Sequence, residues 1–261
     1  MILLVIIEFY LTYGYNYCIK VQWRIIPEIT KKKWDKMSSR KELAGVRIDI
    51  CSLREALHRI EDYVKSEGLH VVESVSMRTI VTAGEDGVVR QCLDEMDLVI
   101  PSDKEILLEL GVTSRQWLDE AREHRFAYEA LRTVAREHHS IYLLTEKREQ
   151  MDRLCQYMEE SFGDYSGICG DAVWEECEGD TERIVNEINA VAPHMLLVML
   201  PTPVQETFLA EHRKMLNIRL WFGVGTENPF AGRKTKPVGA IRKLLAHRKM
   251  KQQIQSSKEE I

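Results

Sequence analysis

The sequence predicts an α/β fold: a mostly parallel sheet with helices on both faces, in a Rossmann-like arrangement, followed by a basic C-terminal helical appendage. Short apolar runs alternate with amphipathic stretches of helical length, which is the pattern of successive βαβ units. The run Met195–Leu200 is apolar throughout, as expected of a strand that is covered on both faces. The last 30 residues are strongly basic, unlike the rest of the chain.

The alternation predicts each element in order along the chain. Leu53–Glu67, for example, carries apolar side chains at helical spacing on one face. The predicted strands are Val46–Ile50, His70–Val75, Leu98–Ile100, Ile141–Leu144, Met195–Leu200 and Ile218–Val224. The predicted helices are Leu53–Glu67, Val88–Met96, Lys104–Leu110, Phe126–His138, Lys147–Glu160, Asp180–Ala190, Thr207–Met215 and Val238–Gln255. The charged stretch Gln116–Arg125 has no predicted element.

The chain length suits one sizeable α/β domain, which we place at residues 37–231. Residues 1–36 are predicted to be a poorly ordered extension, or to precede a natural start at Met37. The apolar run Met1–Ile7 is short for a membrane span and Glu8 interrupts it, so a weak membrane anchor is the second interpretation. Residues 232–261 form the appendage.

The appendage differs from the body in charge. It carries nine Lys or Arg residues and two Glu, a net charge of +7, whereas the whole chain has −5 and the body therefore −12. A basic segment suggests an anionic partner such as membrane phosphates, a pyrophosphate or nucleic acid. Its partial apolar stripe (Ile241, Leu244, Leu245) fits an interfacial helix on anionic lipid or a solvated helix packed by these residues. No aromatic stacking pattern supports nucleic-acid binding.

The motifs disfavour several kinds of site. The six cysteines are scattered, without a CxxC pair or a Cys/His cluster at zinc spacing, so we expect a reducing cytoplasm and neither disulfides nor a metal site. There is no Walker A motif and no G-x-S-x-G elbow. Gly223-Val224-Gly225 lacks the third glycine of a nicotinamide-binding loop, because Asn228 stands there. The two glycines could still let the backbone approach a phosphate or sugar, or form a plain tight turn.

Ligands of open parallel sheets bind at the carboxyl ends of the strands, so the loops there are the candidate sites. These loops are Ser74–Arg78, Pro101–Glu105, Thr145–Lys147, Pro201–Glu206 and Gly223–Asn228. In the first loop, Ser74 and Ser76 alternate with apolar residues. They either face a ligand or line one side of a strand.

The loop Pro201–Glu206 carries the signals of a helix start. Thr202 is predicted to cap the helix, Pro203 to occupy its first position and Gln205 to complete a T-x-x-Q capping box. Glu206 then remains as a carboxylate without a capping duty, near a helix N-terminus that favours anions. A well-made helix start and a ligand site are both open.

The loop Pro101–Glu105 allows the same two interpretations. Ser102 is predicted to cap a helix, with Glu105 closing its capping box. Asp103 either favours the helix dipole or is a carboxylate that takes a proton from a hydroxyl nucleophile.

The order of several motifs resembles that of the WecG/TagA/CpsF glycosyltransferases (glycosyltransferase family 26), over roughly Glu42–Arg248. The segments that carry the resemblance are Leu43-Ala44-Gly45-Val46-Arg47-Ile48-Asp49, Asp97-Leu98-Val99-Ile100-Pro101, Ile184–Ala190, Pro203-Val204-Gln205-Glu206, and Gly223-Val224-Gly225 with Ala231-Gly232. They are similar to the family's first strand, its A-D-L-V-L-P-D-G segment, its I-N-A helix, its P-K-Q-E signature and its G-V-G…A-G loop.

The resemblance implies a parallel sheet and transfer of an N-acetylhexosamine-type sugar from a UDP-sugar donor. The implied acceptor is a polyprenyl-pyrophosphate-linked sugar, in cell-envelope polysaccharide or teichoic acid biosynthesis. The protein would be cytoplasmic and peripheral at the inner face of the cell membrane, where its basic helix meets anionic lipid. No cofactor and no metal are implied, and apolar faces beside the tail would allow a homo-oligomer.

The resemblance also implies roles for single residues. The family's base is the Asp of its P-D-G motif, which is Ser102 here in strict register, so that Asp103 is the expected base only after a shift of one residue. Gln205 and Glu206 would join Asp103 as catalytic residues. The expected substrate-binding residues are Ser74, Ser76, Ser102, Thr202, Gly223, Gly225, Asn228 and Arg233. The departures at these loops leave two hypotheses: a transferase of altered specificity, or an inactive member that binds a sugar nucleotide or a partner.

Overall fold

The structure is a computed structural model of the chain, and it describes residues 39–163, 167–226 and 230. The predicted extension, residues 1–36, and the predicted appendage with its helix Val238–Gln255 lie outside the described residues. The described elements all belong to the unit that begins at Ser39.

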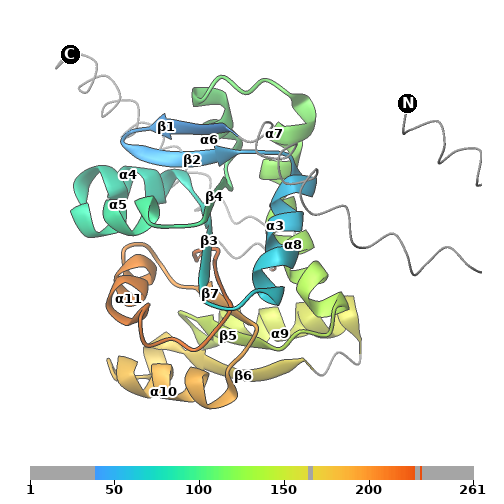
Figure 1. Ribbon diagram of the computed structural model, residues 1–261, viewed down its shortest axis with the longest axis vertical. Coiled ribbons are helices and arrows are strands. Elements are labelled where there is room, and N and C mark those ends of the chain that lie inside the picture. Colours follow the sequence, from blue (N-terminus) through green and yellow to red (C-terminus); the bar gives the residue numbers. More distant parts are fainter. Residues whose placement is uncertain (1–38, 164–166, 227–229, 231–261) are drawn as a thin grey trace, which may run out of the picture. The chain divides into compact units, whose positions relative to one another are not determined.

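A six-stranded sheet runs through this unit (Figure 1). Its strands are β3 (His70–Val75), β4 (Leu98–Pro101), β5 (Ile141–Thr145), β6 (Ile168–Val173), β7 (Met195–Met199) and β8 (Leu220–Gly223). They lie in the order β4-β3-β8-β7-β5-β6, and every neighbouring pair is parallel. β3 and β4 therefore build one half of the sheet, β5 to β7 build the other, and β8 joins the halves. The predicted α/β fold with a parallel sheet is confirmed.

Helices cover both faces of the sheet. They are α3 (Leu53–Lys65), α4 (Met77–Glu85), α5 (Gly87–Asp94), α6 (Lys104–Glu109), α7 (Arg115–Arg122), α8 (Arg125–Arg136), α9 (Arg148–Phe162), α10 (Thr181–Val191) and α11 (Val204–His212), with a short 3-10 turn η2 (Trp174–Glu176). On one face, Val71 and Trp221 of the sheet share a core with Phe208 of α11 and with α4, α5 and α10. On the other face, Val72 shares a second core with Leu131 of α8 and with α3 and α9.

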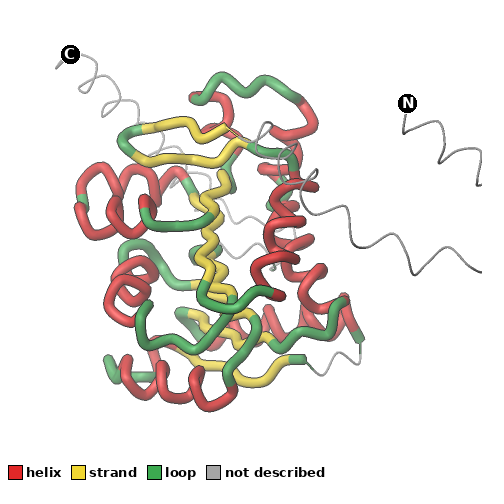
Figure 2. Tube along the Cα trace, in the orientation of Figure 1, coloured by secondary structure: helices red, strands yellow, loops and turns green. Residues whose placement is uncertain are grey.

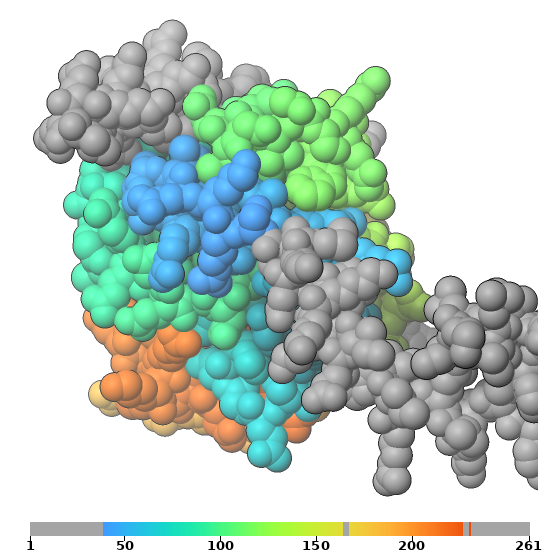
Figure 3. All heavy atoms as spheres, turned by 45° about the horizontal axis from the view of Figure 1, so that its top comes forward, coloured from blue at the N-terminus to red at the C-terminus, as the bar shows by residue number. Residues whose placement is uncertain are grey.

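The predicted strand Val46–Ile50 forms, and it lies outside the parallel sheet. It is β2, and it pairs antiparallel with β1 (Ser39–Leu43) through a turn in which Gly45 has a φ of +78°, a conformation that glycine adopts without strain. The hairpin packs against the edge strand β4, where the Asp49 carboxylate accepts a hydrogen bond of 2.9 Å from the Val99 N–H. Figure 3 shows the hairpin, in blue, between the teal α4–α5 segment and the green α6–α7 segment.

Besides β1 and η2, three observed elements are absent from the sequence prediction (Figure 2). α4 begins directly after β3, inside a stretch that we assigned to a loop. β6 is an edge strand in which Gly170 is partly exposed and Asp171 is exposed, so it shows no apolar run. Ala121 is the single buried residue of α7, so the charged sequence of this helix resembles an exposed segment rather than a core helix.

Candidate active site

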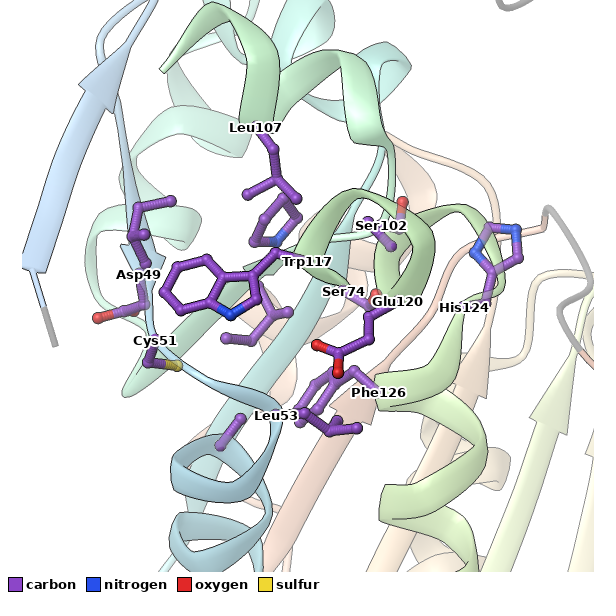
Figure 4. Close-up of a pocket in the computed structure, with 15 residues that line it drawn as sticks. Asp49, Cys51, Leu53, Ser74, Ser102, Leu107, Trp117, Glu120, His124 and Phe126 are labelled. Atoms are coloured by element: carbon purple, nitrogen blue, oxygen red, sulfur yellow. The ribbon is translucent and has the colours of Figure 1, made fainter. Parts of the chain in front are cut away.

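A pocket lies at the carboxyl ends of β3 and β4, beside the β1–β2 hairpin and the helices α7 and α8 (Figure 4). It encloses about 520 Å³, including space that is open to solvent. Ser74 near the end of β3 and Ser102 directly after β4 both line it. The structure thus brings together two of the predicted substrate-binding residues, at the edge where parallel α/β sheets bind their ligands.

The lining of the pocket combines carboxylates with apolar and aromatic surface. Asp49 and Glu120 supply the carboxylates, and Trp117 and Phe126 supply the aromatic rings. Burial raises the pKa of the Cys51 thiol to about 12, so this lining group is neutral at physiological pH. A few polar groups on an apolar wall are typical of a pocket that orients a small organic ligand.

Ser102 and Asp103 are neighbours in the chain but contact different partners. Ser102 Oγ donates a hydrogen bond of 2.9 Å to the Val75 carbonyl, at the pocket wall. Asp103 is 3% exposed, and its Oδ2 accepts a hydrogen bond of 2.8 Å from the Met77 N–H at the start of α4. Asp103 is not among the described residues that line the pocket. Its role as the base stays a prediction.

The predicted capping box at this loop is wrong. α6 begins at Lys104, so Asp103 rather than Ser102 stands at the N-cap, and no side chain caps the helix. The Ser102 hydroxyl instead donates its hydrogen bond to the end of β3, the strand next to β4, before the chain enters α6. Glu105 remains in the first turn of α6, where a carboxylate favours the helix dipole.

A second group of polar side chains lies on the opposite face of the sheet, under α11. Successive side chains of a strand point to opposite faces, so Glu73 faces α11 whereas Ser74 faces the pocket. Glu73 is 1% exposed, and Glu206 and Gln205 of α11 are 0% and 1% exposed. Neither residue of the predicted Gln-Glu pair is among the described residues that line the pocket.

Thr202 binds Glu206 rather than capping α11. Its Oγ1 donates a hydrogen bond of 2.8 Å to Glu206 Oε1 and lies 3.3 Å from Thr79 Oγ1 of α4. α11 begins at Val204, with Pro203 at the N-cap and no side-chain cap, so the predicted T-x-x-Q capping box is wrong. Tertiary contacts to the buried carboxyl outweigh the local capping pattern here.

The side chain of Gln205 explains why the next strand, β8, ends in the glycine Gly223. A Cβ at Gly223 would lie 2.6 Å from Gln205 Nε2, closer than real Cβ contacts come, and a tight 3.2 Å from Glu73 Cγ. Gly225, with a φ of +68°, donates its N–H to Gln205 Oε1 at 3.4 Å. Gly223 is therefore needed by the packing of Gln205 and Gly225 by its positive φ, and the substrate-binding role that we predicted for them stays a prediction.

Glu73 is a buried titratable residue that the sequence analysis missed. Burial, and then the neighbouring Glu206 carboxyl, raise its pKa well above the ordinary value, while a hydrogen bond from Gln205 acts in the opposite direction. Burial also raises the pKa of Glu206, opposed by the Thr202 hydroxyl. Two carboxylates in contact inside the protein resist ionising together, so the protonated form of the pair is favoured relative to ordinary carboxyls. The signal in the sequence is the single Glu inside the run His70–Val75.

Ser76 connects this buried group to the end of β3. Its Oγ caps α4 by accepting a hydrogen bond of 3.3 Å from the Thr79 N–H, and it lies 3.2 Å from Thr79 Oγ1. Hydroxyls therefore link Ser76 through Thr79 and Thr202 to Glu206. Two further predicted substrate-binding residues, Asn228 and Arg233, lie outside the described residues.

Comparison with known families agrees with the resemblance found in the motifs. Residues 41–244 match the model of the glycosyl transferase WecG/TagA/CpsF family, well over half of the chain. A comparison with curated proteins gives no match. Among the described residues, no helix combines the length and the apolar character needed to cross a bilayer. From its motifs, its parallel sheet and the extent of the family match, the chain belongs to the WecG/TagA/CpsF family of glycosyltransferases.

Proposed function

We propose that the protein transfers an N-acetylhexosamine-type sugar from a UDP-sugar to a polyprenyl-pyrophosphate-linked acceptor, in the synthesis of a cell-envelope polysaccharide or teichoic acid. The observation that carries the proposal is the pocket at the ends of β3 and β4. It contains Ser74 and Ser102, the positions at which the family resemblance expects substrate contacts. Hydroxyls, carboxylates and an aromatic wall suit a sugar, which presents hydroxyls along its edges and apolar C–H groups on its faces.

The acceptor in this proposal is bound to a membrane, which gives the basic appendage a function. Residues 232–261 carry a net charge of +7, and each basic residue near an anionic surface contributes on the order of 1 kcal/mol to binding. The protein would then act from the cytoplasmic side of the membrane, as a peripheral protein, with Arg233 near the lipid pyrophosphate. Binding of the whole chain to vesicles with and without anionic lipid tests this part separately, and salt should weaken it.

Release of UDP tests the proposed activity. The whole chain is supplied with a panel of UDP-N-acetylhexosamines and a short-chain lipid-pyrophosphate-linked GlcNAc acceptor. We expect UDP release from at least one donor, and this release should depend on the acceptor. Release that is independent of the acceptor would indicate hydrolysis of the donor and would contradict transfer.

A second function, a non-catalytic binding module, is favoured by one specific observation. The position that corresponds to the family's base is occupied by Ser102, which has no ionisable group at physiological pH. The neighbouring Asp103 carboxylate is engaged with the start of α4. Calorimetric binding of UDP without turnover of any donor would support this second function over the first.

A further inference from the structure

Two carboxylates line the pocket, and they differ in burial and in the hydrogen bonds that they accept. Asp49 is 2% exposed, and its oxygens accept hydrogen bonds from Arg40 Nε at 3.0 Å and from the Val99 N–H at 2.9 Å. The Arg40 contact joins the two strands of the hairpin and the Val99 contact holds the hairpin to β4, so the Asp49 carboxylate has a structural function. Glu120 is half-buried on α7, and its Oε1 accepts a hydrogen bond of 2.9 Å from Gln116 one turn earlier.

Figure 4 shows the Glu120 carboxylate inside the pocket, between the rings of Trp117 and Phe126. Trp117 and Glu120 are three residues apart on α7, so they project from the same face of the helix. The basic residues of α7 pair elsewhere: Arg122 contacts Asp119 at 2.9 Å and Arg115 contacts it at 3.9 Å. The basic side chains of α7 therefore pair with a neighbouring carboxylate, whereas Glu120 lines the pocket.

We propose that Glu120 is the general base of the reaction, an inference that rests on the glycosyltransferase activity proposed above. A base must reach the proton that it removes, and Glu120 lines the same pocket as Ser102, the position of the family's base. The Asp103 carboxylate faces the amide of Met77 instead. The carboxylate that is absent at Ser102, after β4, is supplied from α7, which lines the same pocket.

The chemical step balances with this assignment. Glu120 takes the proton of the acceptor hydroxyl, and the hydroxyl oxygen forms a bond to the anomeric carbon of the donor sugar. The bond between that carbon and the β-phosphate oxygen breaks, and its electron pair leaves with UDP. Glu120 then releases the proton to solvent. Gln116 donates a hydrogen bond to the carboxylate and so orients it.

The test compares the whole chain with Glu120→Gln, Glu120→Asp, Asp103→Asn and a matched control, Glu123→Gln, at the exposed end of α7. UDP release is measured across pH, UDP affinity by calorimetry and the unfolding midpoint by thermal melting. We expect Glu120→Gln to lower kcat about 10²–10⁴-fold, with UDP affinity and midpoint retained. The acidic limb of the pH profile of UDP release should be absent in Glu120→Gln. Glu120→Asp should keep part of the rate that Glu120→Gln loses. Glu123→Gln should match the wild type.

Two results would overturn the proposal, and they differ from each other. A Glu120→Gln variant that turns over within about threefold of the wild-type rate would lack the 10²-fold loss expected when a base is removed. That result would exclude Glu120 as the base. If Asp103→Asn were then inactive with its fold intact, Asp103 would be the base. Absence of turnover by the wild type with every donor would instead overturn the proposed function, and the inference with it.

Discussion

Gln205 lies across the end of β8 so closely that a Cβ on Gly223 would come within 2.6 Å of its amide nitrogen. The amide cannot retreat easily, because it is buried and because its oxygen accepts the Gly225 N–H. The same side chain reaches Glu73 on the neighbouring strand. One glutamine therefore fixes the spacing of α11, β3 and the loop after β8, next to a buried carboxyl pair.

Gly223→Ala should displace Gln205 and lower the free energy of unfolding by about 1–3 kcal/mol, because the added methyl overfills a packed site. Urea denaturation measures the change. Gly87→Ala is the matched control, since a Cβ at Gly87, in the first turn of α5, meets no atom within 4 Å. Equal stability of the two variants would mean that Gln205 does not depend on this glycine.

Glu73→Gln should change how stability depends on pH. Both carboxyls of the pair have pKa values raised above the ordinary value of 4.5, so their stabilising contribution is complete below that pH. It is lost as pH rises through the folded pKa values, because ionising a buried carboxyl costs free energy. The glutamine variant cannot ionise at this position, so it should gain stability relative to the wild type as pH rises above the ordinary value of 4.5.

Denaturation of both proteins at several pH values provides the measurement. The exposed Glu67→Gln is the control, and it should follow the pH dependence of the wild type. Parallel curves for Glu73→Gln and the wild type would show that the pair carries no raised pKa.

Thr202→Val should destabilise the chain by about 1–3 kcal/mol, because Glu206 Oε1 loses the hydroxyl that donates to it at 2.8 Å while it stays buried. The pKa of Glu206 should rise further, since the Thr202 hydroxyl holds it down. Chemical denaturation and the pH dependence of stability test both effects. Thr113→Val, at an exposed position, should change stability little, and a similar loss in both variants would argue against a specific role for Thr202.

Trp117→Ala should weaken binding of the donor by about tenfold, equivalent to about 1.4 kcal/mol, because the pocket loses an aromatic wall. Trp117→Phe keeps a ring and should keep most of the affinity. Calorimetry with UDP and with a UDP-sugar measures both constants, and thermal melting checks that the fold survives. Unchanged affinity in the alanine variant would place the ligand elsewhere.

The sheet was predictable where each strand has an apolar sequence of its own. Met195–Met199 and Ile141–Thr145 are buried on both faces, and their sequences show it. β6 was not predictable in this way, because an edge strand keeps half-exposed residues such as Gly170. The pairing of Val46–Ile50 depends on a partner strand of polar residues, SRKEL, which carries no strand signal.

The candidate site was predictable only in part. The rule that ligands bind at strand ends found Ser74 and Ser102, which both line the pocket. Local capping patterns misplaced Thr202, because its hydroxyl binds a buried carboxyl four residues on. The single Glu inside the run His70–Val75 marks Glu73, but its pairing with Glu206 depends on packing across three elements. The place of Glu120 depends on the direction of a helix without a core-forming pattern, so the sequence carries no signal for it.

Acceptor-dependent UDP release by the whole chain tests the central claim most directly. We expect at least one UDP-N-acetylhexosamine to release UDP only when the lipid-pyrophosphate-linked acceptor is present. No release from any donor, with UDP still binding in calorimetry, would contradict a transferase and would indicate the non-catalytic binding module instead.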